Sequence, residues 1–86
     1  MFNSSRMNIV DQNFLRSLGH RIRERREWHG WTQAELGERC ALHRTFIGSV
    51  ERGERNVSIL NLRLIARILR VSLASLLTES SQPDGE

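Results

Sequence analysis

The sequence predicts an all-α fold, a compact domain of five short helices. Apolar residues recur at spacings of three and four, which is the period of an amphipathic helix. Residues with good N-cap side chains, Thr32, Ser58 and Ser72, stand directly before apolar segments. No segment alternates polar residues with β-branched or aromatic ones, which is the pattern typical of a strand.

The first helix is expected to begin at Asp11 and to stop before Gly30, a residue that favours a left-handed C-terminus. Its apolar positions follow a four-residue spacing with one neighbour: Phe14, Leu18, Ile22 and Leu15. Another face mixes both charges: Arg21, Arg23, Glu24, Arg25, Arg26 and Glu27. We interpret this mixture as a solvated, salt-bridged surface. Trp28 and Trp31 are interpreted as packing residues.

Two signals mark the start of a second helix. Thr32 and Glu35 have the spacing of a capping box, in which each side chain satisfies a free amide of the first turn. Trp31 and Leu36 flank this cap as a hydrophobic staple. A helix over 33–40 is therefore predicted.

A third helix is expected over 44–52, after a short turn at 41–43 and before Gly53. Five residues of this region can form a shared core between the two helices: Leu36, Cys40, Leu42, Ile47 and Val50. Two helices joined by a turn of about three residues form a helix-turn-helix.

Ser58 and Ser72 predict the starts of a fourth and a fifth helix. These two helices carry more apolar residues than one face of a small domain can bury. The surplus predicts a symmetric homodimer whose interface includes Leu64, Ile68, Leu76 and Leu77. The alternative is that all of these side chains fill the core of one chain.

Charge divides the chain in two. All 13 basic residues are arginines and lie at or before residue 70 with seven acids, a net charge of +6. Residues 71–86 carry three acids and no base. A basic body suits a polyanionic partner. We predict a flexible N-terminal arm (1–10), a helix-turn-helix and dimerisation domain (11–78) and a disordered acidic tail (79–86).

Several classes of site are not expected. The single cysteine, Cys40, is interpreted as a small buried apolar residue, and the three histidines lack the spacing of a zinc site. The chain has no nucleophile–base pair and no phosphate-binding glycine loop, so we expect no enzyme, metal, cofactor or small-molecule ligand. No apolar run is long enough for a membrane span or resembles a signal peptide, so we expect a cytoplasmic protein without a membrane partner.

Residues 32–55 resemble the helix-turn-helix of lambda-repressor-like, Xre-type regulators, with the sequence TQAELGERCALHRTFIGSVERGER. Controller proteins of bacterial restriction–modification systems are particularly similar over residues 44–69. The resemblance extends over about 12–78. It implies a lambda-repressor-like fold and a transcriptional regulator of double-stranded DNA, which as a homodimer would bind a palindromic operator.

Two residues depart from that family pattern. Ala41 stands in the turn where glycine is usual, which predicts strain or a slightly altered geometry. His43 stands where controller proteins often have aspartate, and histidine is the poorer N-cap.

The resemblance makes the third helix the recognition helix, whose first residues meet base edges in the major groove. The candidate base contacts are its outward positions: Arg44, Thr45, Gly48 and Ser49. The candidate phosphate contacts surround them: Gln33, His43, Arg52, Arg55 and Asn56. Gln33 opens a helix, where free amides favour a phosphate. For the arginines, pairing with Glu51 and Glu54 is the alternative.

A second function stays open. Antitoxins that neutralise a toxin and regulate their own operon often share this fold, and the acidic tail would then be the partner-binding segment.

Overall fold

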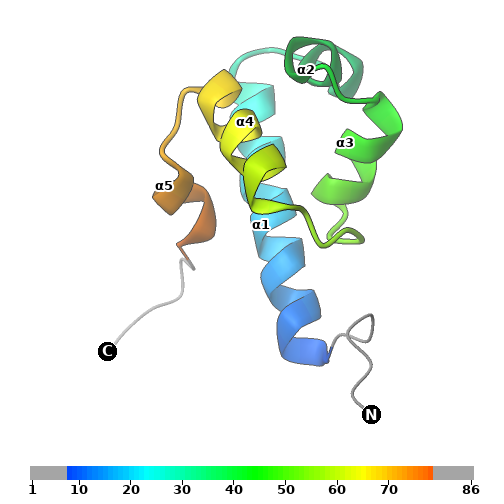
Figure 1. Ribbon diagram of the computed structural model, residues 1–86, viewed down its shortest axis with the longest axis vertical. Coiled ribbons are helices and arrows are strands. Elements are labelled where there is room, and N and C mark those ends of the chain that lie inside the picture. The colour runs from blue at the N-terminus through cyan, green and yellow to red at the C-terminus, as the bar shows by residue number, and fades with distance from the viewer. Residues whose placement is uncertain (1–7, 79–86) are drawn as a thin grey trace.

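The computed structural model describes residues 8–78, and within that range it contains helices and no strand (Figure 1). The helices are α1 (Ile9–Trp28), α2 (Gln33–Cys40), α3 (Arg44–Glu51), α4 (Ile59–Leu69) and α5 (Leu73–Leu77). The predicted all-α fold of five helices is confirmed. Most of the predicted arm and the whole predicted tail lie outside the described residues.

Helix α1 begins two residues earlier than predicted. The Asn8 side chain accepts a hydrogen bond from the Asp11 amide at 2.8 Å, so Asn8 is the N-cap and the helix starts at Ile9. Residues 9 and 10 are therefore helical, and the arm boundary at residue 10 is wrong. At the other end, Gly30 has a φ of +78° and follows the last turn of α1, as expected.

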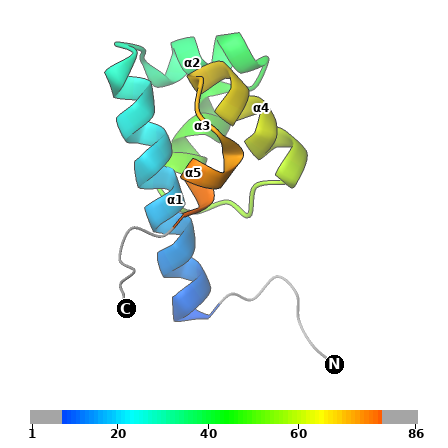
Figure 2. The same ribbon diagram turned by 90° about the vertical axis from the view of Figure 1, so that its left-hand side faces the viewer.

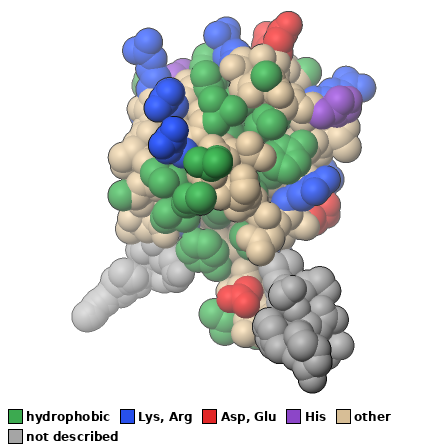
Figure 3. Space-filling view, in the orientation of Figure 1, with side chains coloured by type: hydrophobic (Ala, Val, Ile, Leu, Met, Phe, Trp, Pro, Cys, Tyr) green, Lys and Arg blue, Asp and Glu red, His purple; other side chains and the backbone are tan. Residues whose placement is uncertain are grey.

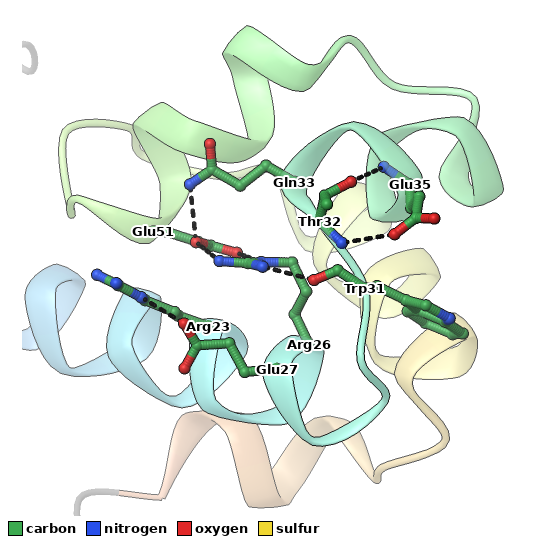
Figure 4. Close-up of polar contacts among 8 residues, drawn as sticks. All are labelled: Arg23, Arg26, Glu27, Trp31, Thr32, Gln33, Glu35 and Glu51. Carbon is green, nitrogen blue, oxygen red and sulfur yellow. Dashed lines mark hydrogen bonds and ion pairs between the residues drawn. The ribbon is translucent and has the colours of Figure 1, made fainter.

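The capping box of α2 is confirmed. The Thr32 hydroxyl accepts from the Glu35 amide at 3.0 Å, and the Thr32 amide donates to the Glu35 carboxylate at 2.7 Å (Figure 4). Helix α2 covers the predicted residues, and α3 ends at Glu51, one residue before its predicted end.

The starts of α4 and α5 are also confirmed. The Ser58 hydroxyl accepts from the Asn61 amide at 3.1 Å, and the Ser72 hydroxyl accepts from the Ser75 amide at 3.0 Å. Each serine satisfies one amide of a first turn that has no partner within the helix.

The long helix α1 lies between α3 on one side and α5 on the other (Figure 1). Helix α2 lies at the top, and α4 lies in front of α1 in Figure 1 and to its right in Figure 2. One core joins all five helices: Leu15, Leu18, Ile22, Leu36, Cys40, Ile47, Val50, Leu62, Ile65, Ala66, Leu69 and Leu76. The shared core of the helix-turn-helix is confirmed, with Leu42 half-buried against it. Burial raises the pKa of the Cys40 thiol to about 11, so this side chain stays a neutral packing group.

None of the helices between residues 8 and 78 has the length and apolar character needed to cross a lipid bilayer. The same stretch contains no cluster of three or more His, Cys, Asp or Glu side chains that could hold a metal ion.

Candidate nucleic-acid interface

The turn between α2 and α3 holds a left-handed residue. Ala41 has φ 56° and ψ 38°, and the amide of Leu42 then donates to the Gly37 carbonyl at 2.8 Å. A left-handed conformation costs a residue with a Cβ about 1–2 kcal/mol. The expectation of strain at Ala41 is thus supported by its backbone geometry.

Helix α3 begins with a histidine cap. The Nδ1 atom of His43 accepts a hydrogen bond from the Thr45 amide at 3.0 Å. Because Nδ1 is the acceptor, the neutral ring carries its proton on Nε2, and the exposed side chain has a donor left for another group. Arg44 and Thr45 are exposed on the first turn of α3, so their predicted outward position is confirmed.

Gly48 does not face outward as predicted. It is buried, and a Cβ placed on it would lie 3.2 Å from both Arg52 Nη1 and Gln33 Oε1. The side chains of Gln33 and Arg52 therefore cover this part of α3. Three predicted contact residues are brought together here, but the glycine lies beneath the other two.

Ser49 is half-buried and engaged within the chain. Its hydroxyl donates to the Phe46 carbonyl at 2.7 Å and accepts from Arg55 Nε at 3.4 Å. The Arg55 guanidinium also lies 5.2 Å from the centre of the Phe46 ring. Ser49, Arg55 and Phe46 thus form one local cluster, while Asn56 is exposed in the loop that follows.

The three arginines of this region differ in their partners. Arg52 pairs with Glu54 at 3.1 Å, and both side chains are more than half exposed, so the alternative of pairing within the chain holds for Arg52. Among residues 8–78, Arg44 and Arg55 form no ion pair. Their positive charges are available to an anionic partner.

A buried ion pair holds the other end of α3, and it was not predicted (Figure 4). Arg26 donates from Nε to Glu51 Oε2 at 2.6 Å and from Nη2 to Oε1 at 3.0 Å, and its Nη1 donates to the Trp31 carbonyl at 2.6 Å. Gln33 Nε2 also donates to Glu51 Oε1, at 3.0 Å. The hydrogen bond with Glu51 raises the pKa of Arg26, against the effect of burial.

The interpretation of Arg26 as part of a solvated face is therefore wrong, since only 8% of this residue is exposed. A signal existed in the sequence. Arg26 follows Ile22 by four residues and Glu51 follows Ile47 by four, so both charges occupy core-facing positions of their helices. Opposite charges at such positions on two helices of one core indicate a buried pair.

The two tryptophans behave differently. Trp28 is 70% exposed, with the Arg25 guanidinium 4.4 Å from its ring centre, so its interpretation as a packing residue is wrong. Trp31 packs against the core and stacks on His29 with ring centres 4.2 Å apart, which confirms the interpretation for this residue.

Apolar side chains gather on the face formed by α4 and α5 (Figure 3). Of the predicted dimer residues, Leu64, Ile68 and Leu77 are half-buried and keep part of their surface exposed. Leu76 is only 3% exposed, because it fills the core between α5 and α1, so it is not available to a second copy. Leu60, which is 68% exposed, adds to this apolar face.

Comparison with known proteins gives consistent results. A family model described as helix-turn-helix matches residues 22–76. The control protein C.SmaI of Serratia marcescens is 44% identical over 61 residues, which cover 71% of this chain and 73% of that protein. The control protein C.BamHI of Bacillus amyloliquefaciens is 40% identical over 69 residues, which cover 79% of this chain and 85% of that protein.

Two solved structures have similar folds at appreciable identity. The restriction-modification controller protein C.AhdI from Aeromonas hydrophila has a TM-score of 0.69 at 36% identity, covering 74% of this chain and 96% of that one. The biofilm master regulator SinR, solved in complex with DNA, has a TM-score of 0.68 at 32% identity, covering 71% of this chain and 98% of that one.

Proposed function

Because this chain belongs to the helix-turn-helix family and is, like its relatives, a DNA-binding transcriptional regulator, we propose that it binds a palindromic operator as a homodimer. The observation that carries the proposal is the first turn of α3. Arg44 and Thr45 are exposed there, beside the exposed His43, at the end of the helix that enters the major groove in this motif.

We assign base reading to Arg44 and Thr45. Arginine can donate two hydrogen bonds to O6 and N7 of guanine, and threonine can donate to a base or contact a thymine methyl. Arg44 has no competing ion pair within residues 8–78, so its guanidinium meets DNA without first leaving a carboxylate. Gly48 and Ser49 are secondary candidates, since side chains of Gln33, Arg52 and Arg55 lie over or on them.

The phosphate contacts fall into two groups. His43 Nε2 and Asn56 are exposed and can donate to the DNA backbone as they stand, and Arg55 can donate from its two terminal nitrogens while its Nε stays on Ser49. Gln33 and Arg52 donate to Glu51 and Glu54 within the chain, and each would have to share or exchange that partner on binding. Since Arg52 and Glu54 are more than half exposed, that exchange costs little.

For the homodimer we propose the apolar face of α4 and α5, with Leu64, Ile68 and Leu77 joined by Leu60. Leu60, Leu64 and Ile68 follow one another at four-residue spacing, so they form one stripe along α4. A twofold dimer would present two α3 helices about 34 Å apart, one turn of DNA. This spacing is the reason for expecting a palindromic operator.

We further propose that the protein is non-catalytic and acts in the cytoplasm as the controller of a restriction–modification system. The similarity to C.SmaI, C.BamHI and C.AhdI over most of this chain supports that role. The antitoxin alternative assigns partner binding to residues 79–86, which lie outside the described residues. The product of a neighbouring gene would distinguish the two, because an antitoxin forms a stable complex with its toxin.

Selection of binding sites from random DNA tests the proposal. We expect an inverted repeat whose half-sites are centred about 10 base pairs apart, and binding that weakens steeply with salt because phosphate contacts release counterions. The variant Leu60→Glu should bind a half-site weakly and sediment as a monomer, while Val10→Glu, equally exposed on α1, should remain a dimer. Enrichment of a single, non-repeated half-site, or an unchanged dimer for Leu60→Glu, would contradict the dimer model.

A further inference from the structure

A groove of about 310 Å³ lies between α1 and α5, lined by Arg21, Arg25, Val71, Ser75 and Leu76. Helix α5 is on the left of α1 in Figure 1 and α3 is on the right, so this groove and α3 lie on opposite sides of α1. It belongs to neither the DNA contacts nor the apolar stripe on α4.

The guanidinium nitrogens of the groove differ in whether they have an acceptor among the described residues. Arg21 Nε donates to the Leu76 carbonyl at 2.7 Å, near the C-terminal end of α5. Within the described part of the chain, two further guanidinium nitrogens, Arg21 Nη2 and Arg25 Nε, are buried and have no hydrogen-bond partner. A buried donor left unsatisfied is costly, and more so when it belongs to a charged group. Among the described residues no acceptor reaches these two nitrogens, and a carboxylate is the acceptor that fits two guanidinium groups.

The acids closest along α1 have other partners. Glu24 pairs with His20 at 3.3 Å, and Glu27 pairs with Arg23 at 3.1 Å. None of the five lining residues carries a carboxylate. Neither of these two acids and none of the lining residues therefore supplies a carboxylate to the groove.

We propose that this groove binds carboxylates of the chain's own C-terminal segment, residues 79–86. That segment contains Glu79, Asp84 and Glu86 and no basic residue. Glu79 follows Leu76 by three residues, and three residues span at most about 11 Å, so its carboxylate starts within reach of Arg21. The binding ties the end of α5 to α1 and leaves the exposed first turn of α3 open to DNA.

A double-mutant cycle on the full-length chain tests this proposal. One variant neutralises the segment (Glu79→Gln, Asp84→Asn and Glu86→Gln), a second is Arg25→Gln, and a third combines them. Neutralising the segment should lower Tm by about 2–4 °C in low salt and by less in high salt. It should also shift the NMR signal of Arg25 Nε–Hε. In the Arg25→Gln background, neutralisation should have a smaller effect on Tm, because only Arg21 remains in the groove to bind the segment.

Arg67→Gln is the matched control, because Arg67 lines a different basic groove with Arg39 and Arg70. Neutralisation should keep its full effect in that background. The proposal is overturned if neutralisation leaves both Tm and the Arg25 signal unchanged. It is also overturned if Arg67→Gln, rather than Arg25→Gln, reduces the effect. A shift of the Arg25 signal on dilution of the neutralised chain would assign the groove to a second copy instead.

Discussion

The two ends of α3 are held in different ways. At the C-terminal end, the Glu51 carboxylate is bound by the Arg26 guanidinium and the Gln33 amide, almost out of contact with solvent. Gly19 brings α1 so close there that a Cβ would overlap the carbonyl oxygens of Val50 and Glu51. At the N-terminal end, an exposed histidine caps the helix after a left-handed Ala41.

This difference separates the end of α3 that fixes the position of the helix from the end that is proposed to contact bases. Removing one partner of a buried charge pair strongly destabilises the fold, because the other charge is left unpaired away from water. An exposed cap or turn contributes only about 1 kcal/mol, so substitution there leaves the fold intact. The end of α3 proposed to contact bases is therefore the end where the sequence can change at little cost in stability.

The largest expected effect is at the buried pair. Arg26→Met should lower the free energy of unfolding by about 3–5 kcal/mol, because it leaves Glu51 buried without its counter-ion. Urea denaturation measures this change. The control Arg23→Met removes an exposed pair with Glu27 and should cost at most about 1 kcal/mol. Equal losses for the two variants would show that the C-terminal end is not held by Arg26.

The close approach of α1 to α3 should also resist change. Gly19→Ala improves helix propensity by about 1 kcal/mol, but its methyl group meets two backbone carbonyls that cannot rotate away. We expect a net loss of about 1–3 kcal/mol in thermal or urea unfolding. A gain in stability from Gly19→Ala would mean that α1 and α3 are farther apart than described.

At the N-terminal end of α3, a substitution in the preceding turn should raise the free energy of unfolding instead of lowering it. Ala41→Gly removes the left-handed strain but increases the freedom of the unfolded chain, for a net gain of about 0.5–1 kcal/mol. Ala34→Gly, at an exposed position inside α2, is the control and should destabilise by about 1 kcal/mol. A loss of stability in Ala41→Gly would argue against the left-handed turn.

The smallest effect is expected at the cap. His43→Ala removes the acceptor for the Thr45 amide and should cost about 0.5–1 kcal/mol. It also removes the outward Nε2 donor, so DNA affinity should fall uniformly across sequences, which a mobility-shift titration on operator and random DNA would measure. A change in sequence preference would instead place His43 among the base-reading residues.

The starts of most helices were predictable from the sequence, whereas contacts between residues far apart in the sequence were not. Thr32, Ser58 and Ser72 mark helix starts by themselves, because a cap acts on amides only two or three residues away. Asn8 caps α1 in the same way but was missed, since no apolar period begins directly after it.

The same limit on prediction from the sequence applies to the candidate DNA-binding residues. The outward position of Arg44 and Thr45 followed from the helical period, whereas the burial of Gly48 depends on side chains from α2 and from the end of α3. Leu76 was assigned to the dimer interface because the sequence does not tell which side of α5 packs against α1. Partners far apart in the sequence, such as Arg26 and Glu51, become visible only once the helices are packed.

The central claim is that the N-terminal end of α3 reads bases while its C-terminal end only positions the helix. The most direct test compares the affinity of Arg44→Ala for the selected operator with its affinity for random DNA. We expect unchanged unfolding, and a loss of about 1–3 kcal/mol on the operator with little loss on random DNA, so that sequence preference falls. An equal loss on both DNAs would show that Arg44 contacts only phosphate and would contradict the claim.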